Sequence, residues 1–315
     1  MSVILPPRLR PGDVVRVVAA SGPVDRDRFE TGLALLGDRY RLRYDDETLF
    51  ACEGFLAGDD AHRLQALGEA LADRQCAAIF AARGGYGLTR ILDGIDQKAL
   101  RARPRPIVGF SDVTAMLAVC ARAGVASIHG PVIAQLGDLP PGDLEALIEL
   151  LETPGPRPLL TDLERLPSRA ASAAGGADVR VRGPLLGGNL EVFSRLLGTP
   201  FVPDLEGAVL FLEEVGERGY RLDRLLTHLE FAGVFDAVSA IVIGDCVNCD
   251  GLKDGVVQAP TAREVVAERL GRLPIPVLLG GAFGHGDRNR ALPYGTQAEL
   301  DARDGILTAL EGAVS

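Results

Sequence analysis

The stretch that decides the fold is Val14-Val15-Arg16-Val17-Val18-Ala19-Ala20, which lies between Gly12-Asp13 and Ser21-Gly22-Pro23. A valine-rich run of this length between turn-forming residues predicts a strand that is buried in a parallel sheet. Apolar residues at helical spacing follow over Asp25–Leu36. A strand that is followed directly by a helix predicts a βαβ unit.

The same alternation continues through the first half of the chain. Apolar runs predict strands at Cys76–Ala82 and Pro106–Gly109. Helical spacing predicts helices at Ala61–Leu71 and Asp112–Ala123, and Gly124 is a typical end for the second helix. We therefore expect an α/β fold whose N-terminal domain is built on a parallel sheet.

The character of the sequence changes after Thr153, where four prolines precede an alanine- and glycine-rich run over Ala170–Ala177. This composition is typical of a linker between domains. Beyond it, the patterns predict strands at Ala208–Leu212, Ala237–Gly244, Gln297–Asp301 and Gly305–Leu310, and helices at Arg221–Phe231 and Ala262–Leu270. We expect an N-terminal domain over residues 1–153, a linker over 154–179 and a mixed α/β C-terminal domain over 180–315.

The overall composition excludes several classes of protein. The 315 residues include 33 Lys and Arg against 43 Asp and Glu, a formal net charge of −10. An acidic chain lacks the basic surface that binds nucleic acids or anionic membranes, so we exclude proteins of these two classes. No apolar stretch is long enough for a membrane-spanning helix or a signal peptide, so we expect a cytoplasmic protein. The chain has five cysteines, which is an odd and small number for its length, so we do not expect a disulfide framework.

A candidate nucleophile follows the strand at Pro106–Gly109. The sequence Ile107-Val108-Gly109-Phe110-Ser111-Asp112 predicts a strand, a sharp turn and a helix. Such a turn exposes the hydroxyl of Ser111, and the amide of Asp112 at the helix start is able to stabilise an oxyanion. The pattern is only half of a G-x-S-x-G elbow, because Val113 stands at the second glycine position. The alternative is that Ser111 only caps the helix.

A serine nucleophile needs a base, and the chain has four histidines. His285 lies in the glycine-rich stretch Gly280–Asp287, where tight turns leave an imidazole accessible. We expect His62 to be solvated and His228 to be structural, while His129 at a strand end either lines a cleft or satisfies backbone groups. His285 is therefore the favoured base.

A neutral imidazole base needs a carboxylate that orients it. Glu213 and Glu214 follow the strand Ala208–Leu212, and ligands bind at the carboxyl ends of strands in α/β sheets. Successive strand residues point to opposite sides, so only one of the two glutamates is able to meet His285. Glu213 continues the strand directly, and the residues alone leave the choice between the two glutamates open. The alternative is that both glutamates begin a solvated loop.

Two glycine-rich stretches offer backbone amides to a ligand. Arg83-Gly84-Gly85-Tyr86-Gly87 follows the strand Cys76–Ala82, and Gly187-Gly188-Asn189-Leu190 predicts a turn that opens a helix. Such turns either hold phosphate or line an oxyanion hole. They leave open a non-catalytic module that binds a nucleotide or a sugar phosphate. Cys246 and Cys249 have C-x-x-C spacing without a second ligand pair, so we expect ordinary thiols and no metal.

Several motifs together resemble a known family. In chain order they are Phe55–Arg63, Ala82–Gly87, Val108–Asp112, His129–Pro131, Gly187–Leu190, Leu212–Glu217, Tyr220–Arg224, Phe283–Gly286 and Leu292–Gly295. Their number, order and spacing are similar to the LD-carboxypeptidase family of serine peptidases (muramoyltetrapeptide carboxypeptidases), which also includes the microcin C immunity proteins. Two departures are Ala20-Ser21-Gly22 in place of the common Pro-Ser, and Glu214 in place of an Asp.

The resemblance implies an active site in a groove between two domains, with Ser111 as nucleophile and Glu213 and His285 completing the triad. It implies an oxyanion hole made by the amides of Asp112 and Gly85. The implied reaction removes the C-terminal D-alanine from murein tetrapeptides by cleaving an L,D-peptide bond, in cell-wall recycling. The family is cytoplasmic and typically dimeric, and it needs no cofactor.

Recognition of a substrate with a free carboxylate calls for local positive charge. The candidates are Arg83 with its neighbours Gly84 and Tyr86, and Arg221, with Arg224 close by in the sequence. The chain is short and has no Trp, which favours the recycling peptidase over a microcin-immunity-like hydrolase of a peptide or aminoacyl nucleotide.

Overall fold

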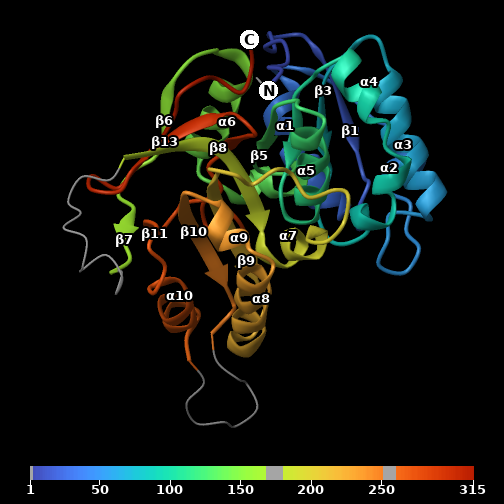
Figure 1. The fold of residues 1–315 in the computed structure, drawn as a ribbon. Coiled ribbons are helices and arrows are strands. Elements are labelled where there is room, and N and C mark those ends of the chain that lie inside the picture. Colours follow the sequence, from blue (N-terminus) through green and yellow to red (C-terminus); the bar gives the residue numbers. More distant parts are fainter. Residues whose placement is uncertain (1–2, 168–179, 251–259) are drawn as a thin grey trace. The chain divides into compact units, whose positions relative to one another are not determined.

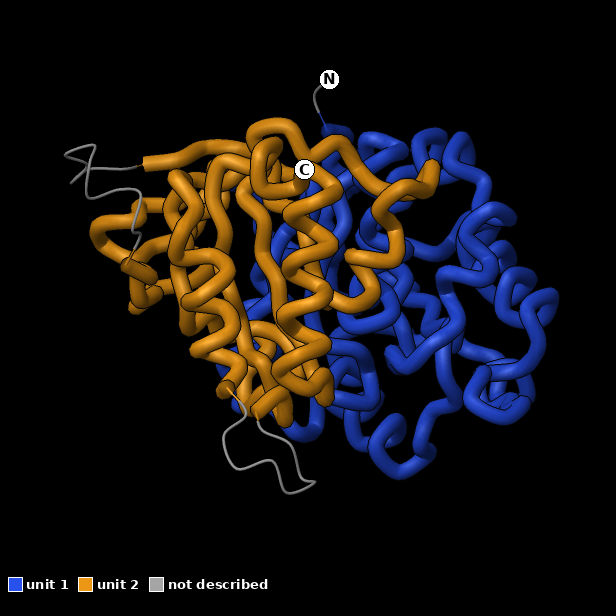
Figure 2. Tube along the Cα trace, turned by 60° about the horizontal axis from the view of Figure 1, so that its bottom comes forward, with its two compact units in different colours: residues 1–155, 290–295, 312–315 blue, residues 156–289, 296–311 orange. Residues whose placement is uncertain are grey.

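The computed structural model describes residues 3–167, 180–250 and 260–315. The chain divides into two compact units, which are coloured separately in Figure 2. Unit 1 contains residues 1–155, 290–295 and 312–315, and unit 2 contains residues 156–289 and 296–311. Each unit is built on its own sheet.

The sheet of unit 1 has the strand order β12-β5-β4-β3-β1-β2. Its strands are β1 (Val14–Val18), β2 (Arg41–Arg43), β3 (Cys76–Ala81), β4 (Ile107–Gly109), β5 (Ser127–His129) and β12 (Leu292–Tyr294). The pairs from β2 to β5 are parallel, and only β12 pairs antiparallel, with β5. This arrangement brings the carboxyl ends of β1, β3 and β4 to one edge of the sheet.

The helices of unit 1 follow the strands, as Figure 1 shows. They include α1 (Arg26–Gly37), α2 (Asp46–Leu49), α3 (Asp60–Ala72), α4 (Gln97–Ala102), α5 (Thr114–Arg122) and α6 (Pro141–Glu152). Asp25 and Asp59 cap α1 and α3 by accepting hydrogen bonds from backbone amides of the first turn. Residues 114–120 of α5 are all buried, so this helix belongs to the core of the unit.

The sheet of unit 2 is mixed, with the strand order β6-β14-β13-β8-β9-β10-β11-β7. Its strands are β6 (Arg157–Leu160), β7 (Glu164–Arg165), β8 (Arg180–Asn189), β9 (Val209–Val215), β10 (Ala240–Val247), β11 (Val277–Leu279), β13 (Gln297–Asp301) and β14 (Ile306–Ala309). The four strands β8 to β11 are parallel to one another, and the remaining pairs are antiparallel. Helices of this unit include α7 (Leu190–Leu196), α8 (Gly219–Phe231), α9 (Val234–Ala237) and α10 (Ala262–Leu270).

The predicted α/β fold, with a parallel N-terminal sheet and a mixed C-terminal sheet, is confirmed. The structure differs from the predicted boundaries in two places. Residues 157–160 and 164–165 of the predicted linker are strands of unit 2, while 168–179 lie outside the described residues. Residues 290–295 belong to unit 1 because β12 pairs with β5, and residues 312–315 belong to it because the backbone of Ser315 bonds to Pro6 and Arg8.

The predicted turn at Gly187-Gly188 is wrong. Both glycines belong to strand β8, where they directly precede its last residue, Asn189. Glycine is required there for another reason. A Cβ on Gly187 would lie 1.8 Å from the carbonyl oxygen of Phe211 on the neighbouring strand β9. Within the residues that the structure describes, no helix has the length and apolar character needed to cross a membrane.

Candidate active site

Ser111 begins a 3-10 turn (η3, Ser111–Val113) between β4 and α5. Its φ of 61° lies in the left-handed region, which costs a non-glycine residue roughly 1–2 kcal/mol. A Cβ on Gly109 would lie 2.7 Å from a methyl carbon of Val113, so the tight turn requires glycine at 109. Val113 and not Ser111 occupies the N-cap position of α5. The geometry is that of a strained elbow, and it does not support Ser111 as a simple helix cap.

The glycine-rich turn after β3 packs directly against this elbow. A Cβ on Gly84 would lie 2.8 Å from the Cβ of Ser111 and 2.9 Å from its hydroxyl oxygen. The carbonyl of Gly84 accepts a hydrogen bond from the amide of Gly22 at 3.1 Å. Gly85 has a φ of 109°, which favours glycine. Backbone of this turn therefore comes as close to Ser111 as glycine allows, as an oxyanion-binding loop requires.

The predicted substrate-binding residues of this turn differ in exposure. Arg83 is exposed, and its guanidinium donates a hydrogen bond to the carbonyl of Pro23. Tyr86 is 47% exposed, and its ring lies 5.6 Å from that of Phe55, which is 65% exposed. Sequence reasoning missed Phe55 as a partner of Tyr86. Two exposed aromatic rings beside the Ser111 turn form an apolar surface that a substrate is able to contact.

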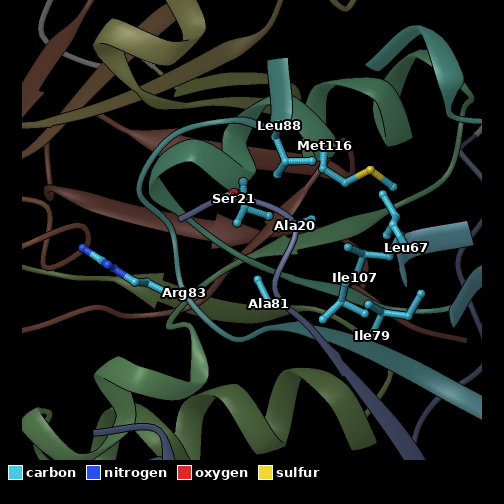
Figure 3. A pocket seen from close by; sticks show the side chains of 11 residues that line it. Ala20, Ser21, Leu67, Ile79, Ala81, Arg83, Leu88, Ile107 and Met116 are labelled. Carbon is cyan, nitrogen blue, oxygen red and sulfur yellow. The ribbon is translucent and has the colours of Figure 1, made fainter. Parts of the chain in front are cut away.

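An apolar cavity lies next to the same turn (Figure 3). Leu67, Ile79, Ile107 and Met116 line it from the interior of unit 1. In Figure 3 the side chain of Arg83 extends away from these apolar groups. A cavity without charged groups directed into it does not suit a peptide carboxylate, so we interpret it as a packing space beneath the turn.

In unit 2, His285 and Glu213 form a close pair. The Nδ1 of His285 and the Oε2 of Glu213 are 2.7 Å apart, the hydrogen bond expected from the sequence. The Glu213 side chain has no exposed surface, whereas the His285 side chain is 20% exposed. A carboxylate on Nδ1 favours the tautomer with the proton on that atom, which leaves Nε2 as the acceptor. The pair is therefore suited to general-base chemistry.

Backbone closes over this pair. A Cβ on Gly284 would lie 2.6 Å from the Oε2 of Glu213, and Gly284 has a φ of 112°. Glycine is therefore needed next to His285, as the glycine-rich sequence indicated. The other carboxylate oxygen of Glu213 is buried without a hydrogen-bond partner among the described residues.

Glu214 does not contact His285, and its carboxylate accepts hydrogen bonds from other groups instead. Its carboxylate accepts hydrogen bonds from the amides of Glu191 (2.8 Å) and Val215 (2.7 Å) and from the side chain of Asn189 (3.3 Å). Burial raises the pKa of Glu214 to about 7, and the charge of Glu213 adds to the effect. The alternation of strand residues thus separates the two glutamates, and neither of them begins a solvated loop.

The other three histidines have different environments. His62 is half-buried, with Nε2 3.2 Å from the carbonyl of Thr48, so the prediction of a solvated side chain is wrong. His129 is fully buried, and its ring lies 6.0 Å from that of Phe110 in an edge-on arrangement. His228 is exposed in the last turn of α8, so it has no place in a packed core.

The arginines proposed for unit 2 lie together on α8. Arg221 is exposed, and it contacts Glu217 at 3.5 Å and the Tyr220 hydroxyl at 3.3 Å. Arg224 lies over the Tyr220 ring, 5.5 Å from its centre. The positive charge lowers the pKa of Tyr220, chiefly through its hydrogen bond with Arg221.

The surroundings of the C-x-x-C cysteines disfavour the thiolate form. Cys249 is buried, and burial raises its pKa to about 11. Burial raises the pKa of Cys246 further, with the charges of Cys249 and Glu214 adding to the effect. Both thiols are therefore protonated at neutral pH, whereas metal binding and nucleophilic attack need the thiolate.

Two features of unit 1 were not found from the sequence: the side chain of Asp112 and that of Arg63. Asp112 is buried, and its carboxylate accepts a hydrogen bond from the amide of Leu88 at 2.9 Å. Arg63 has no exposed surface. The available signal was the position of Arg63 on the same face of α3 as Ala66, Leu67 and Ala70, because a cation in an apolar stripe needs a buried partner.

Comparison with known proteins identifies relatives over nearly the whole chain. The family model described as the LD-carboxypeptidase N-terminal domain matches residues 15–130, and the one described as the LD-carboxypeptidase C-terminal domain matches residues 182–300. The murein tetrapeptide carboxypeptidase of Pseudomonas aeruginosa is 32% identical, over 91% of this chain and 92% of its own.

Solved structures agree with this result. A muramoyltetrapeptide carboxypeptidase from Oxalobacter formigenes is 28% identical, with a TM-score of 0.78 over 95% of this chain and 98% of its own. MccF in complex with glutamyl sulfamoyl guanosine has a TM-score of 0.86 over 99% of each chain. At 23% identity, the second likeness shows the fold alone.

Proposed function

Because the chain belongs to the LD-carboxypeptidase family and is a peptidase, we propose that it is a serine-type carboxypeptidase that removes the terminal D-alanine from murein tetrapeptides. The bond cleaved joins the L-centre of the third residue of the peptide to D-alanine, and in the family that third residue is meso-diaminopimelate. The observation that carries the proposal is the strained elbow at Ser111, packed against a glycine-rich turn within unit 1.

In the proposed mechanism, the Ser111 hydroxyl attacks the carbonyl carbon and gives its proton to Nε2 of His285. The amides of Asp112 and Gly85 donate hydrogen bonds to the oxyanion that forms. His285 then returns the proton to the departing amine, and an acyl group stays on Ser111. Water, deprotonated by the same imidazole, hydrolyses this ester and restores the serine. Glu213 keeps the imidazole in the required tautomer and stabilises it when it is charged.

Substrate recognition is proposed to use Arg83, Gly84 and Tyr86 of unit 1 and Arg221 of unit 2. The exposed guanidinium groups of Arg83 and Arg221 are suited to a free carboxylate. We further propose that the protein acts in the cytoplasm as a homodimer without a cofactor. Sedimentation of the purified protein tests the homodimer directly.

A panel of peptides tests the substrate class. Tetrapeptides that differ at positions three and four are assayed for release of the last residue, beside aminoacyl sulfamoyl nucleosides as the competing substrate class. Release of D-alanine from the murein tetrapeptide supports the proposal. Cleavage of the nucleosides alone would assign a microcin-immunity-like hydrolase.

A serine-directed fluorophosphonate distinguishes a serine hydrolase of either substrate class from a non-catalytic nucleotide-binding module. The probe should label Ser111 in the native protein, and Ser111→Ala should lose labelling and several orders of magnitude in turnover while its thermal unfolding is unchanged. Ser194→Ala is the matched control, because this buried serine lies in α7, outside the proposed site. Near-native turnover of folded Ser111→Ala would eliminate the proposed nucleophile.

A further inference from the structure

The side chain of Asp112 connects the elbow of Ser111 to the far end of the glycine-rich turn. Asp112 is 1% exposed, and its Oδ2 accepts the hydrogen bond from the amide of Leu88. Burial raises the pKa of this carboxyl, while hydrogen bonds with the amide of Leu88, the side chain of Ser21 and the amide of Gly87 act in the opposite direction. The side chain of Asp112 therefore contacts the glycine-rich turn. This contact is separate from the oxyanion-binding role proposed for the backbone amide of the same residue.

Arg63 supports the same turn from α3. Its guanidinium donates to the carbonyl of Ala20 at 2.8 Å and pairs with Asp60. A Cβ on Gly87 would lie 2.5 Å from the Nη1 of Arg63, so the guanidinium is packed directly against the turn. Its positive charge also favours the ionised form of Asp112. The cation and the carboxylate thus act on the same short piece of backbone.

Arg63 is fully buried, and burial of its charge lowers the stability of the folded protein unless other contacts compensate. Burying its charge costs several kcal/mol before pairing is counted. The neighbours of Arg63 on the buried face of α3 are Ala66, Leu67 and Ala70, so an apolar side chain would suit the helix. A buried ion pair is weak evidence for a contribution to stability, so a positional role for Arg63 is the hypothesis to test.

We propose that Asp112 and Arg63 are positioning residues that hold the Gly84–Leu88 turn against Ser111 and thereby fix the oxyanion-binding amide of Gly85. This inference rests on the proposed function, in which Ser111 is the nucleophile. The turn is tied at one end by the bond between the Gly84 carbonyl and the Gly22 amide. Asp112 ties the other end at Leu88, and the amide of Gly85 lies between the two ties.

The size of the expected effect follows from the tolerance of such sites. Catalytic groups need to be held within about 0.5 Å of the productive geometry. A glycine-rich turn has little stiffness of its own, so releasing one tie lets the Gly85 amide move beyond that limit. Loss of one oxyanion donor typically lowers kcat by about 10²–10³.

The test compares Asp112→Ala, Asp112→Asn and Arg63→Met in three measurements: steady-state kinetics, the rate at which a fluorophosphonate labels Ser111, and hydrogen exchange of the peptide that covers the turn. Asp112→Ala should lower kcat and the labelling rate by about 10² each, with KM changed less than about threefold. Asp112→Asn should recover part of the loss, because its amide oxygen still accepts from Leu88. Arg63→Met should show a smaller loss of the same kind.

Matched controls separate positioning from general destabilisation. Asp143→Ala and Arg105→Met each remove a buried charged side chain of unit 1, and Arg105 donates to the carbonyl of Ala70, away from the turn. The controls should keep native labelling rates at an equal loss of unfolding free energy. If they slow labelling as much as the Asp112 and Arg63 variants do, the proposal is overturned.

Hydrogen exchange keeps failure of the inference distinct from failure of the proposed function. If native protein is neither labelled at Ser111 nor active, the proposed function fails, whereas faster exchange of the turn in Asp112→Ala than in Asp143→Ala still supports the tie. Unchanged exchange in Asp112→Ala contradicts the inference whatever the activity. If Asp112→Ala does not fold, Asp112→Asn and Arg63→Met give the same comparisons.

Discussion

Replacing Glu213 with glutamine tests the pairing with His285 most directly. The two side chains are nearly equal in shape, and the buried carboxylate bonds to Nδ1 at 2.7 Å, so packing changes little. The replacement removes the charge that stabilises an imidazolium. A glutamine NH₂ group facing Nδ1 also holds the imidazole in the tautomer whose Nε2 carries a proton. That tautomer is unable to accept the proton of Ser111.

The expected loss is large. The corresponding carboxylate-to-amide change in a Ser-His-Asp triad lowers kcat by about 10⁴. At about 1.4 kcal/mol for each factor of ten, this equals about 5 kcal/mol of transition-state stabilisation. The second carboxylate oxygen of Glu213 has no partner among the described residues, so the amide gains no compensating bond there. We therefore expect a fall in kcat of about 10³–10⁴ for Glu213→Gln.

Glu214→Gln is the matched control, because it makes the same chemical change at the adjacent residue. Glu214 accepts bonds from the amides of Glu191 and Val215 and makes no contact with His285. Its pKa of about 7 means that it is partly protonated at neutral pH, and glutamine imitates that state. We expect kcat to stay within about threefold of native. Stability should fall by about 1–3 kcal/mol, because the amide nitrogen of glutamine is unable to accept the hydrogen bond of one of the two backbone amides.

The assay is D-alanine release under single-turnover conditions, with urea unfolding of each variant as the control for folding. A severe loss in Glu213→Gln and a mild one in Glu214→Gln would support the assignment. The reverse order would refute it, since it would make Glu214 the orienting carboxylate. Equal, small effects of both changes would show that hydrolysis does not depend on an ionised partner of His285.

Three further predictions concern the pKa of Glu214, the close packing of Gly84 and the metal independence of the reaction. Because the folded pKa of Glu214 is about 7 and the ordinary value is 4.5, folded protein binds more protons than unfolded chain between these values, so native stability should fall as pH rises through that window. Urea unfolding should therefore show Glu214→Gln gaining about 3 kcal/mol on native between pH 4.5 and pH 8, and no relative gain would contradict the shift. Gly84→Ala should slow fluorophosphonate labelling by at least tenfold, because its Cβ would lie 2.9 Å from the Ser111 hydroxyl, whereas Gly68→Ala, which meets no neighbouring atom, should label normally. Chelators should leave hydrolysis unchanged, and inactivation that zinc reverses would instead implicate Cys246 and Cys249.

The long elements were predictable because local pattern and burial agree. The strand Cys76–Ala81 and the helix Ala262–Leu270 appear almost where the apolar spacing placed them. The short edge strands Arg157–Leu160 and Glu164–Arg165 were not predictable, because their pairing depends on partners more than 100 residues away. The same is true of Leu292–Tyr294, which joins the sheet of unit 1 through Ser127–His129.

At the site, the sequence identified the groups whose local pattern is distinctive. Ser111 follows a strand at a tight turn, and Glu213 continues a strand whose alternation separates it from Glu214. Neither pattern contains the partner of Glu213, because His285 is 72 residues further along the chain. The family resemblance supplied that pairing, and the contact in the structure agrees with it.

The position of Arg63 among the apolar residues of its helix was a sequence signal that was not used. An amphipathic helix is recognised by its apolar stripe, and a charged residue inside the stripe is usually treated as noise. Yet a buried cation is so costly that the fold has to supply acceptors for it, here the carbonyl of Ala20 and the carboxylate of Asp60. Proteins break local rules mainly at functional or strained sites. An arginine in the stripe of Asp60–Ala72 is therefore a signal for acceptors within the fold, and the structure supplies one of them from the backbone at Ala20.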